Sequence, residues 1–70
     1  MIYPVIDARG RSCPEPVILT KKALENNPEG IVVLVDNKTA HENVSRFARN
    51  AGYQVRLEQE GPDFRLTLAK

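Results

Sequence analysis

The residues best suited to chemistry are gathered in one short stretch, Arg9-Gly10-Arg11-Ser12-Cys13-Pro14-Glu15-Pro16. It contains the only cysteine of the 70-residue chain. A thiol reacts as its thiolate, and a single cysteine cannot form an intramolecular disulfide, a Cys-x-x-Cys redox pair or a multi-cysteine metal site. We therefore expect Cys13 to be a nucleophile without a second thiol to discharge it, and we expect no metal and no cofactor.

The helix that would position Cys13 is predicted to run from Pro14 to about residue 27. Pro14 fits the first helical position, and Pro16 is tolerated because its ring would crowd only a carbonyl that precedes the helix. Cys13 would then lie at or near the N-cap, where the helix dipole and the backbone N–H of Glu15 stabilise an anion. The alternative is that Cys13 is a small buried residue with an inert thiol.

Nearby charges would adjust the reactivity of this thiol. Arg9 and Arg11 add positive potential, whereas the carboxylate of Glu15 opposes it, so we expect a modestly lowered thiol pKa. Asp7 is expected to orient the loop by accepting backbone N–H bonds. His41 is the only histidine, and we expect a surface role for it in preference to a role as the base for Cys13.

The pattern of apolar residues predicts the order βαβαββ around this stretch. We expect strands at 3–8, 31–35, 53–58 and 64–69, and helices at 14–27 and 39–51. In the second helix, Thr39 and Glu42 are predicted to form a capping box, and Gly52 is predicted to end it. Its core face is expected to include Ala51.

These elements indicate one domain over residues 1–70, an α/β (α+β) fold. We expect a two-layer α/β sandwich, with a four-stranded mixed sheet and both helices on one face. Both strand–helix–strand steps should join parallel neighbours, and the last two strands should form a hairpin. The other sheet face would be open to water, where Val32 and Leu34 could dock a partner, a second domain or another copy.

Composition sets limits on the function. The net charge is +1 with both signs interleaved, so direct nucleic-acid binding is not expected. No apolar run is long enough for a membrane span, and the first residues lack the features of a signal peptide. A lone free thiol suits a reducing compartment, so we expect a cytoplasmic protein.

The sequence also resembles a known family. Asp7-Ala8-Arg9-Gly10 followed by Cys-Pro-x-Pro at 13–16 resembles the TusA (SirA-like) sulfur-carrier family over essentially the whole chain. Val35-Asp36-Asn37 and residues 42–48 are similar to the TusA-like amino-terminal domain of YedF-type selenium-metabolism proteins, which usually carry a second domain. The chain departs from the family at Arg11, where leucine is common.

The resemblance implies a function for this site. Cys13 would accept sulfur, or selenium, as a persulfide from a donor of the cysteine desulfurase or rhodanese type. It would then pass the atom to an acceptor protein, as a sulfurtransferase-like carrier. The residues expected to make up the motif and the surroundings of the thiolate are Arg9, Gly10, Arg11, Pro14, Glu15 and Pro16.

A second hypothesis stays open, a non-catalytic protein- or RNA-binding module that uses the open sheet face and a basic surface. The basic residues that would form this surface are Arg9, Arg11, Lys21, Lys22, Lys38, Arg46 and Arg49. A thiol redox enzyme is disfavoured because the chain has no second cysteine.

Overall fold

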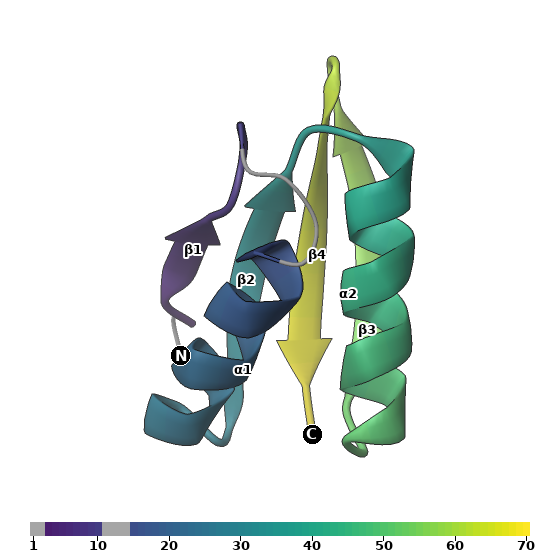
Figure 1. The fold of residues 1–70 in the computed structure, drawn as a ribbon. Coiled ribbons are helices and arrows are strands. Elements are labelled where there is room, and N and C mark those ends of the chain that lie inside the picture. Colours follow the sequence, from purple (N-terminus) through teal and green to yellow (C-terminus); the bar gives the residue numbers. More distant parts are fainter. Residues whose placement is uncertain (1–2, 11–14) are drawn as a thin grey trace.

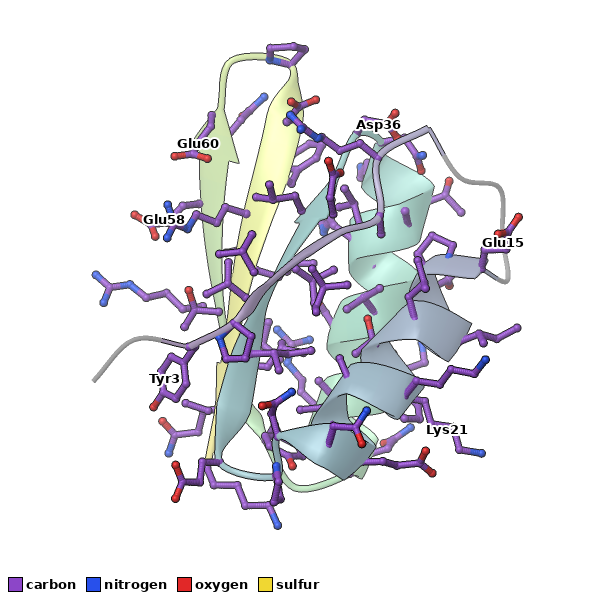
Figure 2. The ribbon with its side chains drawn as sticks, turned by 90° about the vertical axis from the view of Figure 1, so that its left-hand side faces the viewer. Tyr3, Glu15, Lys21, Asp36, Glu58 and Glu60 are labelled. Atoms are coloured by element: carbon purple, nitrogen blue, oxygen red, sulfur yellow. The ribbon has the colours of Figure 1, made fainter. Side chains whose placement is uncertain are left out.

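Two helices cover one face of a four-stranded sheet, as the predicted βαβαββ order requires (Figure 1). The computed structural model describes residues 3–10 and 15–70. The elements are β1 (Val5–Asp7), α1 (Glu15–Asn26), β2 (Gly30–Val35), α2 (Lys38–Asn50), β3 (Gln54–Glu60) and β4 (Asp63–Ala69). Seen from the side, the sheet and the helices form two layers (Figure 2). The expected two-layer sandwich is confirmed, and within the described residues no helix is long and apolar enough to cross a membrane.

The strand order is β1-β2-β4-β3, which corrects one part of the expected topology. β1 and β2 are parallel neighbours, and β3 and β4 form the predicted antiparallel hairpin. However, β4 also pairs antiparallel with β2, with Gly30 opposite Ala69, so β2 and β3 are not neighbours as we had expected. Burial explains the choice: Leu66 and Leu68 of β4 are fully buried, whereas β3 carries charged residues that suit an edge strand.

The core lies between the sheet and the two helices. Thr20 is the polar residue that α1 contributes to this core, and its hydroxyl donates to the carbonyl of Pro16 at 2.8 Å. Ala51, expected on the core face of α2, is instead an exposed cap residue. The buried helix residues are Pro16, Thr20, Ala23 and Leu24 from α1 and Ala40, Val44, Ser45 and Ala48 from α2.

The amino terminus of α2 differs from the predicted capping box. The N-cap is Asn37, whose Oδ1 accepts the backbone N–H of Ala40 at 2.7 Å, so Thr39 lies inside the helix. Asn37 has the extended backbone of an N-cap (φ −151°, ψ 160°). The predicted capping box of Thr39 and Glu42 is therefore wrong, because a favoured N-cap residue two positions earlier begins the helix.

The carboxyl end of α2 follows the prediction. Gly52 has a φ of 91° and donates to Arg49, while the N–H of Tyr53 reaches back to the carbonyl of Ala48 at 2.9 Å. These two bonds form a Schellman motif. Tyr53 precedes β3 and is buried, and its hydroxyl donates to the carbonyl of Pro28 at 2.7 Å.

The open face of the sheet is less exposed than the alternation of residues predicted, and exposed apolar residues lie on the edge strands. Val32 lies on the face opposite the helices but is only 5% exposed, so it offers little area for docking. Leu34 is half-buried, and Val5 of the edge strand β1 is exposed. Leu57 faces the helix side, yet 46% of it is exposed because it lies on the edge strand β3.

Candidate functional site

The described part of the candidate site consists of the two chain segments that flank the cysteine. Arg9 and Gly10 precede it and follow β1, and Glu15 and Pro16 begin α1. Cys13, Arg11 and Pro14 lie outside the described residues.

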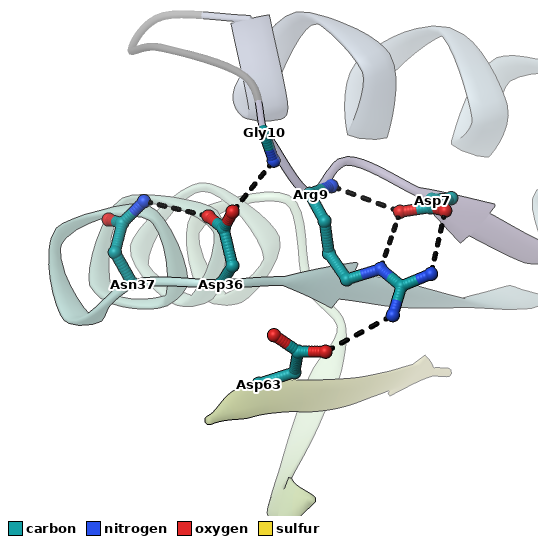
Figure 3. A network of polar contacts seen from close by, with 6 residues as sticks. All are labelled: Asp7, Arg9, Gly10, Asp36, Asn37 and Asp63. Carbon is teal, nitrogen blue, oxygen red and sulfur yellow. Dashed lines mark hydrogen bonds and ion pairs between the residues drawn. The ribbon is translucent and has the colours of Figure 1, made fainter. Parts of the chain in front are cut away.

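Arg9 is held by two carboxylates from opposite ends of the chain (Figure 3). Its Nε and Nη2 donate to the two oxygens of Asp7 at 2.9 and 3.0 Å, and its Nη1 donates to Oδ2 of Asp63 at 3.1 Å. The backbone N–H of Arg9 also donates to Asp7, at 3.0 Å. The hydrogen bonds to Asp7 and then Asp63 raise the pKa of the guanidinium above its ordinary value, so Arg9 is permanently charged.

This geometry qualifies the electrostatic role that we expected of Arg9. Asp7, Arg9 and Asp63 together carry a net charge of −1, so the two carboxylates offset the positive potential that Arg9 would supply to a nearby thiol. The contacts that Arg9 does make tie the end of β1 to the start of β4. Asp7 accepts the N–H of Arg9, which confirms its expected role in orienting this loop.

Gly10 links the same loop to the second helix (Figure 3). Its N–H donates to Oδ2 of Asp36 at 2.8 Å, and Oδ1 of Asp36 accepts from Nδ2 of Asn37 at 3.1 Å. Asn37 in turn caps α2 through Ala40. Gly10 has a φ of 73°, which favours glycine at this position. A chain of three hydrogen bonds therefore joins the residue that enters the cysteine loop to the first turn of α2.

The other flank of the cysteine is the first turn of α1. Glu15 is exposed there, and Pro16 is fully buried on the core face of the helix. Because the ring of Pro16 packs into the core and its carbonyl accepts from Thr20, the start of α1 is fixed from both its side chain and its backbone. Cys13 therefore comes three residues after one anchored position, Gly10, and three residues before another, Pro16.

His41 packs against an aromatic ring of β4. Its ring centroid is 4.5 Å from that of Phe64, with the planes tilted by 44°, and the side chain is half-buried. This contact gives His41 a packing role at the surface of the sandwich.

Asp36, Asn37 and Asp63 are parts of the site that we had not predicted from the sequence. Asp36 and Asn37 directly follow the predicted strand at 31–35, beside the first strand, so their position could have indicated contact with the loop after that strand. Asp63 gave no such signal, because it is 54 residues from Arg9 and reaches it only through the pairing of β4 with β2.

Comparison with known proteins places the chain among sulfur-transfer proteins. The family model described as sulfurtransferase TusA matches residues 5–70. A candidate sulfur carrier protein of Methanocaldococcus jannaschii is 47% identical over 68 residues, covering 93% of this chain and 91% of that protein. Another candidate sulfur carrier, from Thermotoga maritima, is 33% identical over 64 residues, covering 87% of this chain and 81% of its own length.

A solved structure agrees with both the fold and the family. The crystal structure of a SirA-like protein from Desulfitobacterium hafniense superposes with a TM-score of 0.84 at 38% identity, covering 99% of this chain and 96% of that one. The likeness therefore extends over the sheet and both helices. The chain belongs to the TusA family.

Proposed function

We propose that the chain is a sulfur carrier that holds sulfur as a persulfide on Cys13 and delivers it to a partner protein. The observation that carries this proposal is membership of the TusA family together with a single cysteine in Cys-Pro-x-Pro. The relatives named as candidate sulfur carriers, from an archaeon and a bacterium, support the same assignment. No second thiol is present in the chain to discharge the persulfide as an internal disulfide.

The transfer is a thiol–persulfide exchange. The Cys13 thiolate attacks the terminal sulfur of a persulfide on a donor protein of the cysteine desulfurase or rhodanese type. A new S–S bond forms on Cys13, the donor's S–S bond breaks, and the donor cysteine leaves as a thiolate. A nucleophile of the acceptor protein then attacks the terminal sulfur, and Cys13 leaves as a thiolate. No external oxidant or reductant is consumed, because the sulfur atom moves between thiols with its oxidation state unchanged.

The described surroundings support this role through positioning. The loop leaves β1 through Arg9 and Gly10, which are bonded to Asp7, Asp63 and Asp36. It ends at α1, whose amino terminus favours a nearby anion such as a thiolate or persulfide. Fixing both flanks lowers the conformational freedom lost when the carrier docks on a donor.

Mass spectrometry after loading tests the proposal. The protein is incubated with a cysteine desulfurase and cysteine, and we expect a mass increase of one sulfur atom that a reducing agent removes. The Cys13→Ser variant, with a matched side-chain size, should show no increase. Loading of the variant, or no loading of the wild type by desulfurase and rhodanese donors, would refute the proposal. Repeating the assay with a selenium donor tests the selenium cargo and the proposed likeness to YedF-type proteins.

The alternative of a non-catalytic binding module gains no specific support from the described contacts. Arg9, one member of the supposed basic surface, is bonded to Asp7 and Asp63, and Val32 on the open face is nearly buried. Salt-sensitive binding of RNA or protein that survives Cys13→Ala would favour this module over a carrier.

A further inference from the structure

The strand β3 presents a free edge of seven residues. It is the last strand in the order β1-β2-β4-β3, and its other side pairs with β4 along the whole strand, from Gln54 opposite Ala69 to Glu60 opposite Asp63. An antiparallel ladder alternates, so every second residue turns its backbone N–H and C=O away from the partner strand. An edge of this length can accept another strand unless its side chains prevent it.

Two copies of β3 that pair antiparallel would place residues of opposite charge opposite each other. In Gln54-Val55-Arg56-Leu57-Glu58-Gln59-Glu60, a twofold axis at Leu57 places Arg56 of one strand opposite Glu58 of the other, twice. The same axis places Leu57 opposite Leu57 and Gln54 opposite Glu60. Opposite charges on directly facing residues stabilise an antiparallel pair, and like charges destabilise it.

The exposed apolar area lies at the same point of the strand. Leu57 points to the helix side of the sheet but remains 46% exposed. It lines a groove of about 440 Å³ between α2 and β3, together with Glu42, Ser45, Arg46 and Arg49. A second Leu57 on the axis would cover this apolar surface from the open side of the groove.

The groove carries complementary charges as well. α2 runs antiparallel to β3 beside it, so a twofold axis at Leu57 also reverses α2 (Figure 1). Glu42 and Arg49 lie about one helical turn on either side of Ser45, and the axis brings Glu42 of one copy toward Arg49 of the other. The strand is therefore matched to a second copy, and on the helix the pairs of Glu42 with Arg49 offset the approach of Arg46 to its own copy near the axis.

We propose that the free edge of β3 is a self-association surface, at which two copies of the chain pair antiparallel about Leu57. The two sheets then continue as one eight-stranded sheet with both α2 helices on the same face. β1, which is followed by Arg9 and Gly10, lies at the opposite edge of each sheet from this surface. This proposal does not rest on the proposed carrier function, so either of the two can fail without the other.

Sedimentation equilibrium of the full chain at concentrations up to about 1 mM tests this surface. The wild type is compared with variants in which the charges of β3 are reversed. We expect a weak dimer for the wild type, with a dissociation constant on the order of 100 μM for an interface of this small size. Arg56→Glu places two pairs of like charges across the axis and should weaken association at least about tenfold. The double variant Arg56→Glu/Glu58→Arg exchanges the charges and should restore association.

Two controls separate the interface from folding. Arg56 faces Thr67 within its own sheet, so its replacement breaks no ion pair among the described residues, and far-UV circular dichroism should be unchanged. Glu58 faces Arg65, so the double variant is compared with the wild type only where its circular dichroism shows that it is folded. Lys21→Glu makes the same change of charge on α1, away from β3, and should not alter association. A wild type that is monomeric at every concentration, a dimer indifferent to Arg56→Glu, or a folded double variant that fails to dimerise would each overturn the proposal.

Discussion

Replacement of Asn37 by alanine tests how the candidate site is joined to the second helix. The substitution removes the acceptor of the Ala40 N–H, a bond of 2.7 Å, and the donor to Asp36, a bond of 3.1 Å. Loss of an N-cap of this kind costs about 1 kcal/mol, and the lost side-chain bond to an exposed carboxylate adds about 0.5 kcal/mol. The expected decrease in the free energy of unfolding is therefore about 1.5 kcal/mol, or a fall of about 6–12 °C in Tm for a domain of this size.

Urea unfolding followed by far-UV circular dichroism measures this loss of stability. Two further variants separate the contribution of the capping bond from that of the bond to Asp36. Asn37→Asp keeps a capping oxygen but replaces the amide donor with a second carboxylate beside Asp36, so it should lose less than about 1 kcal/mol. Thr39→Ala, the matched control within the same turn, should change stability by no more than about 0.5 kcal/mol. If Thr39→Ala is more damaging than Asn37→Ala, the capping assignment and the link from Gly10 to α2 through Asn37 are refuted.

Two further comparisons test the packing that supports the site. A Cβ at Gly30 would clash with the carbonyl of Leu68, whereas at Gly52 it would meet nothing within 4 Å, and both residues have positive φ (149° and 91°). Gly52→Ala should therefore cost about 1 kcal/mol from backbone strain alone, and Gly30→Ala should cost at least about 3 kcal/mol, as measured by urea unfolding; equal losses would contradict the clash. Leu66 and Leu57 face each other in the β3–β4 ladder but are 0% and 46% exposed. In thermal unfolding, Leu66→Ala should cost about 3 kcal/mol and Leu57→Ala less than about 1 kcal/mol, and similar Tm values for the two would show that the core has been misplaced.

Periodicity predicted the helices well because it depends on local spacing. Both predicted helices are present, and the buried face of α1 contains Pro16, Thr20, Ala23 and Leu24. The predicted start of the second helix was wrong because two capping signals lie close together there. Thr39 with Glu42 satisfies the capping-box pattern, but Asn37 is a more favoured N-cap and comes first after β2, so the helix begins there.

The features that could not be predicted depend on distant parts of the chain. Leu57 lies on the helix side of the sheet, but its exposure depends on β3 being at the edge. The partners of Arg9 likewise depend on strand order, since Asp63 comes beside β1 only because β4 pairs with β2. The family motif predicts that the chemistry lies at Cys13, and the motif residues Arg11, Cys13 and Pro14 lie outside the part of the chain that the structure describes.

The two-residue turn between β3 and β4 tolerates neither insertion nor deletion without a change in the pairing of β4. Gly61, with a φ of 60°, and Pro62 fit a type II′ turn, and Asp63 follows immediately as the first residue of β4. One inserted residue here would either bulge the hairpin or shift β4 by one position, and a shift would turn Leu66 out of the core and carry Asp63 away from Arg9. Insertions and deletions should therefore be rarer at this exposed tip than its distance from the cysteine in sequence would suggest, because its length determines which residue meets the loop that leads to Cys13.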